Sequence, residues 1–363
     1  MKSYFFTSES VTEGHPDKVC DMISDGLLDK YLEVDPKSRC AIECFVTGNL
    51  LIIGGEVKSS ASVNIEESAR DIIRSIGYTD PDLSFSNQCE VIVKVQPQTQ
   101  ELNQNATGMK AGDQGIMFGY ACEGPDLMPA PIWLAHKITK HLAEFRRKRY
   151  AWLRPDGKSQ VTMRFPERII DNIVIAAHHS PYIDLPVLRK ELKTSMLEIL
   201  PDKYIDEHTK FYINKYSTFH DGGPGADTGL TGRKIIVDTY GGWAKHGGGA
   251  FSGKDATKVD RSGAYMARHI AKCVVHSGLA NECEIQLGFV LGQTQPVSIR
   301  IFTHGTGDEF EIERIIRDSF DLTVEGIINY LKLTESVFSK TAAYGHFGEN
   351  TAQMSWEQVK TIY

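Results

Sequence analysis

The sequence lacks the features that mark disulfide-rich, zinc-binding and membrane proteins. Its seven cysteines, spread over 363 residues, are odd in number and include no C-x-x-C pair, so they suggest neither a disulfide framework nor a zinc site. No apolar run approaches the length of a membrane span, and the N-terminus lacks the apolar core of a signal peptide. We therefore expect a protein of a reducing, cytoplasmic environment that does not enter a membrane.

An excess of positive charge is also missing. The chain has 40 Lys and Arg against 47 Asp and Glu, a net charge of -7, which speaks against a general surface for nucleic acid. A hydrophobic content of 41% and a charged content of 24% are ordinary for a globular protein, and the length suits about two or three domains. Any anion-binding site must therefore be a local cluster of basic residues.

One such cluster lies in residues 246–262, which read HGGGAFSGKDATKVDRS. Glycines let backbone N–H groups approach an anion, and lysines supply charge for phosphate oxygens. Residues 248–254 satisfy most of the P-loop pattern, but Asp255 stands where a Ser or Thr should ligate magnesium. The segment predicts a polyphosphate site outside an ordinary P-loop fold. A flexible glycine linker with solvated charges is the plain alternative.

A threefold pattern organises the rest of the chain. Apolar residues at helical spacing predict three long helices, each followed by a β-hairpin and a second helix, and each unit begins with a short strand. The units recur at about 120 residues, which indicates domains rather than a solenoid. The predicted long helices cover 19–31, 134–145 and 259–274; the hairpins 40–57, 160–177 and 284–302; the second helices 64–77, 184–201 and 312–320; the first strands 4–7, 116–120 and 235–238.

The pattern predicts an α+β fold of three related domains in a pseudo-threefold arrangement. Each domain is expected to be a mixed or antiparallel sheet with helices on one face, and strands over 88–95 and 210–214 should extend the first two sheets. The predicted domains are residues 1–100, 112–226 and 228–357.

Asp17 and Asp260 fall near the starts of equivalent long helices. Acids are common there for structural reasons alone, because they suit the positive end of the helix dipole. As a pair flanking a lysine-rich loop they become candidate magnesium ligands, since that ion takes one or two carboxylates plus substrate phosphates. His15, just before the first helix, could donate to a developing negative charge, although a lone histidine is more often a capping residue.

Two further loops carry polar residues between glycines. Residues 222–229 contain Asp227, whose carboxylate could hold an amine or a ribose, and they lead to the cations Arg233 and Lys234. Residues 111–115, AGDQG, could simply form a turn before a strand.

Taken together, these loops resemble those of the methionine adenosyltransferase family, also called S-adenosylmethionine synthetases. The motifs are GHPDK at 14–18, AGDQG at 111–115, GLTGRKIIVDTYGG at 229–242, HGGGAFSGKD at 246–255 and AAYGHFG at 342–348. The resemblance covers essentially the whole chain. It implies that the sulfur of L-methionine attacks C5′ of ATP and displaces the triphosphate, which is then cleaved to phosphate and diphosphate.

The resemblance also implies roles for individual residues. Those matching the family's catalytic positions are His15, Lys158, Arg233, Lys254 and Lys258. Those matching ATP-site positions are His15, Asp156, Lys158, Phe219, Asp227, Arg233, Lys234, Ala250 and Lys254, and those matching methionine-site positions are Glu56, Gln98, Asp227 and Lys258. Asp17 and Asp260 would ligate magnesium, two ions per site, and Glu43 matches a potassium-site acid, although an acid on a strand otherwise reads as a solvent-facing position.

The family's assembly and its mobile loop are implied in the same way. The resemblance predicts a homo-oligomer with active sites between subunits, as a dimer of dimers, and no nucleic-acid partner. A mobile active-site loop is expected at 99–111, where it looks short, and Lys110 and Thr218 depart from the family's pattern. A catalytically silent nucleotide-binding paralogue or regulatory subunit is the alternative, against which the complete charged set argues.

Overall fold

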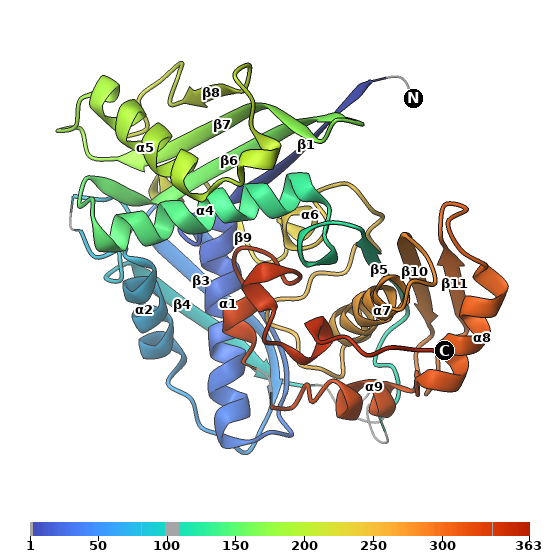
Figure 1. Ribbon diagram of the computed structural model, residues 1–363. Coiled ribbons are helices and arrows are strands. Elements are labelled where there is room, and N and C mark those ends of the chain that lie inside the picture. Colours follow the sequence, from blue (N-terminus) through green and yellow to red (C-terminus); the bar gives the residue numbers. More distant parts are fainter. Residues whose placement is uncertain (1–2, 81, 99–108, 336) are drawn as a thin grey trace.

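The computed structural model describes residues 3–80, 82–98, 109–335 and 337–363. In this part of the chain three β-sheets, each with a long helix packed against it, are arranged around the N-terminal helix (Figure 1). The strands are β1 (Tyr4–Val11), β2 (Arg39–Thr47), β3 (Leu50–Lys58), β4 (Glu90–Pro97), β5 (Gly115–Cys122), β6 (Leu153–Phe165), β7 (Ile169–His179), β8 (Lys210–Ile213), β9 (Gly229–Leu230), β10 (Glu282–Phe289) and β11 (Ser298–Phe302).

The helices follow the predicted order. They are α1 (Pro16–Val34), α2 (Ile65–Ile76), α4 (Ala130–Lys148), α5 (Leu185–Ile199), α6 (Ile235–Asp238), α7 (Val259–His276), α8 (Glu309–Ser319) and α9 (Val324–Tyr330). The three long helices α1, α4 and α7 and the second helices α2, α5 and α8 confirm the periodicity read from the sequence. No helix in the described part of the chain is long and apolar enough to cross a membrane.

Local chemistry explains where these helices begin and end. In α1, Pro16 occupies the first turn, where its missing N–H costs nothing, and Val19, Ile23 and Leu27 form one buried face. In α2, the Asn64 side chain accepts from the Glu67 N–H at 3.2 Å, and Gly77 ends the helix in the left-handed region at φ 108°. Both helix ends of α2 were predicted.

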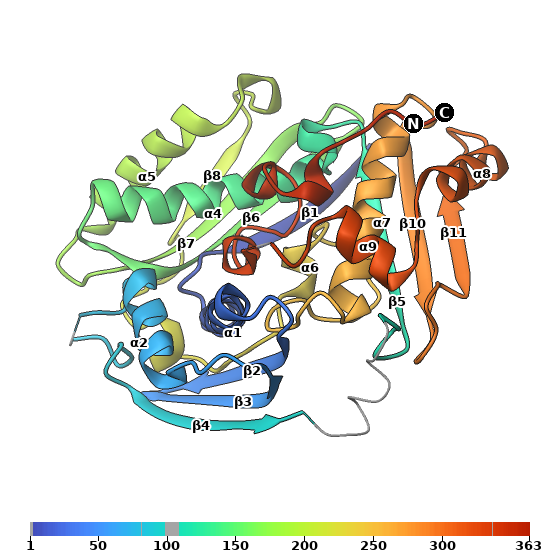
Figure 2. The same cartoon turned by 90° about the horizontal axis from the view of Figure 1, so that it is seen from below.

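The sheets confirm the predicted α+β class and show how the sequence units are joined. Their strand orders are β1-β6-β7-β8, β4-β3-β2-β9 and β11-β10-β5, antiparallel throughout except that β3 pairs with β4, and β7 with β8, in parallel. Helix α1 packs on β2, α4 on β6 and β1, and α7 on β5 and β10. Figure 2 shows the sheets with these helices toward the middle of the molecule.

The first strand of a sequence unit joins the sheet of the next one. Strand β1 pairs with β6 over its whole length, from Tyr4 opposite Phe165 to Val11 opposite Lys158, and β5 pairs with β10. The short strand β9, from the third unit, returns to pair with β2. The long helix of each unit thus begins directly beside a sheet built from another unit, and the connections between them become the places where distant residues meet.

One predicted strand is wrong. Residues 235–238 form the helix α6, in which the Asp238 N–H donates to the Lys234 carbonyl at 2.9 Å. A run of three apolar residues followed by an aspartate is compatible with either state, so its pattern does not decide between them. In the structure α6 turns the Asp238 carboxylate inward, where it pairs with the buried ammonium of Lys18.

Candidate active site

The connection between β1 and α1 is folded tightly against strand β6. The Thr12 N–H donates to the Gly157 carbonyl at 2.9 Å, and a Cβ added to Gly14 would lie 2.4 Å from the Pro155 carbonyl carbon, so only glycine fits there. This close approach places His15 and Asp17 beside the start of β6, which carries Asp156 and Lys158.

His15 caps α1 and is buried, with 3% of its surface exposed. Its Nδ1 accepts a hydrogen bond from the Asp17 N–H at 3.2 Å. Burial, and then the positive charges of Lys234 and Lys158, lower the pKa of His15 to about 3. The ring is therefore neutral near pH 7, and because Nδ1 is an acceptor, its proton is on Nε2, which is a donor.

The Asp17 carboxylate collects donors from the third sequence unit. It accepts from Lys234 Nζ at 2.6 Å and from the Leu230 N–H at 3.0 Å, and Arg233 Nε lies 3.5 Å away. Burial raises the pKa of Asp17, but the hydrogen bonds from Lys234 and Leu230 outweigh it, and the pKa is lowered overall. We refer to His15, Asp17, Lys158, Arg233 and Lys234 as the first cluster.

Asp156 and Phe219 lie beside the first cluster. Asp156 Oδ2 accepts from the Gly223 N–H at 2.8 Å, while its buried Oδ1 has no hydrogen-bond partner among the described residues. Burial raises the pKa of Asp156 to about 6. The Phe219 ring stacks on His178, with centroids 5.2 Å apart, and Asp227 is exposed. An unpaired acceptor and an aromatic face suit the hydroxyl and the ring of a nucleoside.

The glycine-rich segment before α7 is bound to the edge of β2 as if it were a further strand. Lys254 forms a β-bridge with Ala41, and the Ile42 N–H donates to the Gly253 carbonyl at 3.1 Å. Gly253 has φ 81°, and an added Cβ there would lie 1.9 Å from the Ile42 carbonyl oxygen. The glycines of this segment therefore permit close packing and do not form a flexible linker.

Asp255, which occupies the position of the P-loop Ser or Thr, anchors this segment. Its buried carboxylate accepts from the Cys40 N–H at 2.8 Å, from Lys258 Nζ at 2.5 Å and from the Thr257 N–H at 2.9 Å. Burial raises the pKa of Asp255, but the charge and hydrogen bond of Lys258 outweigh this, and the pKa is lowered. The residue that breaks the P-loop pattern thus holds the loop to β2.

A second cluster forms where this segment enters α7. Lys254 Nζ donates to Asp260 Oδ2 at 2.7 Å. A Cβ added to Gly249 would lie 2.3 Å from Asp260 Oδ1, so the glycine leaves the carboxylate open to the loop backbone. We refer to Lys254, Lys258 and Asp260 as the second cluster. Among the residues that the structure describes, no ion pair joins it to the first.

The two clusters are connected through Ala250 and Gly232. A Cβ added to Gly232, the residue before Arg233, would lie 2.5 Å from the Ala250 Cβ. The segment 246–262 therefore packs directly against the loop that carries the cations of the first cluster.

The expected methionine-site residues lie next to Lys254 on the sheet. Glu56 pairs with Ala41, which bridges to Lys254, so these side chains share one face. Gln98 Nε2 donates to Glu56 Oε1 at 3.4 Å. Glu43, two residues from Ala41 on the same face, is exposed.

A row of acids along α1, of which the sequence analysis singled out only Asp17, holds the third unit in place. Asp17, Asp21, Asp25 and Asp29 recur every four residues and therefore lie on one helix face. Asp21 accepts from Lys18 and from the Gly232 N–H, Asp25 from Arg261 and the Gly253 N–H, and Asp29 from the N–H groups of Phe338 and Ser339. The spacing of these acids was the available signal.

The donor groups suit the expected magnesium ions only with help from a ligand. Within the described ranges no group of three or more His, Cys, Asp or Glu residues could hold a metal ion. Asp17 and Asp260 each offer one carboxylate beside glycine loops and lysines, which fits Mg²⁺ when phosphate oxygens complete its shell. For potassium, Glu43 offers a single exposed carboxylate.

The structure thus gathers most of the predicted site residues in two adjoining clusters. The predicted loop 99–111 lies mainly outside the described residues. Of its last residues, Ala111 donates its N–H to the Gln293 carbonyl at 2.9 Å. Three buried charged residues that were not among the predicted site residues stabilise the backbone around the clusters. They are Lys18, Asp25 and Arg261.

Comparison with protein families agrees with this arrangement. Three family models match the chain: the S-adenosylmethionine synthetase N-terminal domain at residues 3–100, the central domain at 108–219 and the C-terminal domain at 221–358. Together they cover nearly all of the chain.

Similar curated proteins carry the same name. The S-adenosylmethionine synthase of Myxococcus xanthus strain DK1622 is 48% identical over 369 residues, covering 98% of this chain and 93% of that protein. That of Desulfosudis oleivorans is 47% identical over 376 residues, covering 99% of this chain and 97% of that protein.

Proposed function

The chain belongs to the S-adenosylmethionine synthetase family, and from this membership we propose that it makes S-adenosylmethionine from ATP and L-methionine. The methionine sulfur attacks C5′ of the ribose, the C5′–O bond breaks, and its electron pair leaves with the triphosphate. A sulfonium product remains, and the triphosphate is hydrolysed to phosphate and diphosphate. The observation that carries this proposal is that the neutral His15 ring lies among three cationic side chains, those of Lys158, Arg233 and Lys234.

His15 is the donor for the leaving oxygen. Its Nε2 carries the proton, while Nδ1 is held by the Asp17 N–H, so the ring is oriented before substrate binds. A neutral donor stabilises the oxygen as negative charge develops in the transition state. Lys158, Arg233 and Lys234 neutralise the triphosphate, and Lys234 exchanges its contact with Asp17 for a phosphate oxygen.

Asp156 and Phe219 hold the adenosine. Asp156 Oδ1, which is buried and has no hydrogen-bond partner in the described part of the chain, accepts a hydrogen bond from a ribose hydroxyl. This bond removes the cost of burying an unpaired acceptor. Phe219, backed by His178, stacks on the adenine. Asp227, exposed beside them, is available for an ammonium or a hydroxyl group.

Glu56, Gln98 and Lys258 form the methionine-side wall, and Lys254 beside them binds the polyphosphate. We propose that this wall completes the site of a second subunit in a homo-oligomer, a dimer of dimers. The proposal is supported by the open sheet face on which Glu56 and Glu43 lie and by the absence, in the described part of the chain, of an ion pair between the two clusters. Asp17 and Asp260 would hold magnesium together with phosphate oxygens, and the bound ions would neutralise charge on the triphosphate. Glu43 is the candidate potassium ligand.

The product distribution tests this function. Purified protein with ATP, L-methionine, magnesium and potassium should yield S-adenosylmethionine, phosphate and diphosphate in equal amounts. ADP as the main nucleotide product would contradict the proposal, because it would show transfer of a terminal phosphate in place of displacement at C5′. A solution mass measurement tests the assembly separately.

A further inference from the structure

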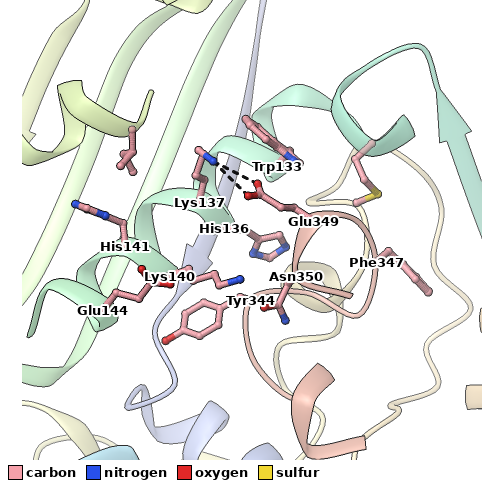
Figure 3. A pocket seen from close by; sticks show the side chains of 12 residues that line it. Trp133, His136, Lys137, Lys140, His141, Glu144, Tyr344, Phe347, Glu349 and Asn350 are labelled. Carbon is pink, nitrogen blue, oxygen red and sulfur yellow. Dashed lines mark hydrogen bonds and ion pairs between the residues drawn. The ribbon is translucent and has the colours of Figure 1, made fainter. Parts of the chain in front are cut away.

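A cavity of about 180 Å³ lies away from the two clusters, between α4 and the C-terminal segment 344–350 (Figure 3). Its walls come mainly from one face of α4 and from the AAYGHFG motif. No residue of either cluster lines it. Its volume is slightly larger than that of engineered cavities of about 150 Å³ that hold benzene.

The lining of the cavity is chemically mixed. Met128, Trp133 and Phe347 provide apolar and aromatic surface, with Lys137 Nζ 4.9 Å from the Trp133 ring centroid, and Lys140, His136 and Asn350 provide polar groups. Figure 3 shows the Lys140 side chain extending from α4 toward the segment that carries Tyr344 and Asn350. A ligand with a flat apolar body and a polar head matches this lining.

Of the two lysines that line the cavity, Lys140 forms no ion pair in the described part of the chain. Lys137 Nζ lies 3.3 Å from Glu349 Oε1, across the two walls, and Glu144 pairs with Lys148 at 3.7 Å. Lys140 is partly buried and has no ion pair or hydrogen bond among the described residues. A partly buried, uncompensated ammonium favours an anion of single charge.

A buried imidazole forms part of the cavity wall. His136 is 7% exposed, and its Nδ1 is hydrogen-bonded to Ser10 Oγ at 2.8 Å. A Cβ added to Gly345 would lie 2.7 Å from His136 Nε2, so this nitrogen faces the protein backbone. Figure 3 places this ring in the wall between α4 and Asn350.

We propose that this cavity is a binding site for a small, flat monocarboxylate, with its carboxylate on Lys140 and its apolar body against Trp133, Met128 and Phe347. The volume accommodates a single six-membered ring with a carboxyl group. A phosphate ester of a nucleoside is too large and too highly charged for one free lysine.

Benzoate is the probe that tests the site, by titration calorimetry of the full-length protein without ATP or methionine. We expect one site per chain with a Kd of about 1 mM, as is ordinary for a ligand of this size. Benzyl alcohol, which keeps the ring but lacks the charge, should bind about tenfold more weakly. Binding should be unaffected by tripolyphosphate, which would occupy the clusters.

Variants on α4 decide where benzoate binds. Lys140→Gln should weaken binding about tenfold and Lys140→Arg should retain it, while Lys30→Gln, at an exposed lysine of α1 outside the cavity, should leave the Kd unchanged. Trp133→Ala should also weaken binding. Absence of saturation, an unchanged Kd in Lys140→Gln, or displacement by tripolyphosphate would overturn the proposal. None of these readouts depends on the proposed enzymatic activity.

Discussion

The Arg261 guanidinium binds both carboxylate oxygens of Asp25, at 2.8 and 2.7 Å, with both side chains fully buried. This pair joins α7 to α1 directly behind the glycine-rich segment. Asp25 also accepts from the Gly253 N–H, and Arg261 donates to the Lys254 carbonyl at 2.8 Å. The pair therefore fixes the backbone on both sides of the Lys254 side chain.

Removing one member of this pair should damage both stability and activity. Asp25→Ala leaves a buried guanidinium without its carboxylate, which costs about 3–5 kcal/mol of unfolding free energy. Urea denaturation should show this loss. Arg314→Met, which removes an exposed arginine paired only with acids on its own helix, is the control and should change stability by less than about 0.5 kcal/mol.

The double variant Asp25→Leu with Arg261→Met separates the two effects. Replacing a buried pair by apolar residues of similar size is often neutral for stability, so most of the unfolding free energy should return. S-adenosylmethionine formation should stay low, because the Gly253 N–H and Lys254 carbonyl still lack their partners. Recovery of full activity together with stability would show that the pair does not position Lys254.

His15 should be required for the displacement step. Loss of one donor to a developing oxyanion commonly lowers kcat by about 10²–10³, so His15→Ala should show a loss of that size. His15→Asn retains an N–H donor and should recover part of it. His208→Ala, at an exposed histidine, should behave like the unchanged protein. Normal kcat in His15→Ala would contradict the assigned role.

The affinity for ATP should fall on acidification because of Asp156. Its pKa is raised to about 6, so the carboxylate is ionised above pH 6 and becomes protonated below it. A protonated Oδ1 no longer serves as a full acceptor for a ribose hydroxyl. The KM for ATP should therefore rise as the pH drops from 7 to 5, and Asp156→Asn should show a raised KM with no such dependence. A KM equally pH-dependent in Asp156→Asn would assign the effect to another group.

Helices and hairpins could be predicted because their signals are local. The apolar spacing of α1, α4 and α7, the Asn64 cap and the Gly77 stop all act over a few residues. The strand exchange could not be read in this way, since nothing within residues 4–11 indicates pairing with β6, about 150 positions later. The same limit explains the error at α6, whose inward face is decided by Lys18, 220 residues away.

Most residues of the candidate site were predicted from family motifs, and only some from the chemistry of the residues themselves. Glycines and lysines in 246–262 indicated an anion site, but the function of Asp255 depends on Cys40 and could not be seen locally. Asp21 and Asp25 were not among the predicted site residues. Their burial depends on Arg261 and on the loop amides that arrive from the third unit.

Asp255→Ser provides a direct test of how the glycine-rich segment works. This change restores the P-loop pattern GxxxxGKS in the sequence, so if the segment functioned as a P-loop, the new hydroxyl would assist magnesium and ADP release would rise. The structure predicts the opposite. Serine is too short to reach the Cys40 N–H and carries no charge for Lys258, so the loop should detach from β2. We expect S-adenosylmethionine formation to fall at least about tenfold, with no ADP, on the basis of about 1.5–3 kcal/mol for a charged hydrogen bond.

Asp318→Ser, at an exposed helix position, is the matched control and should leave the product distribution unchanged. Increased ADP release in Asp255→Ser would mean that this residue blocks a phosphate-transfer site, and its role as an anchor would have to be abandoned.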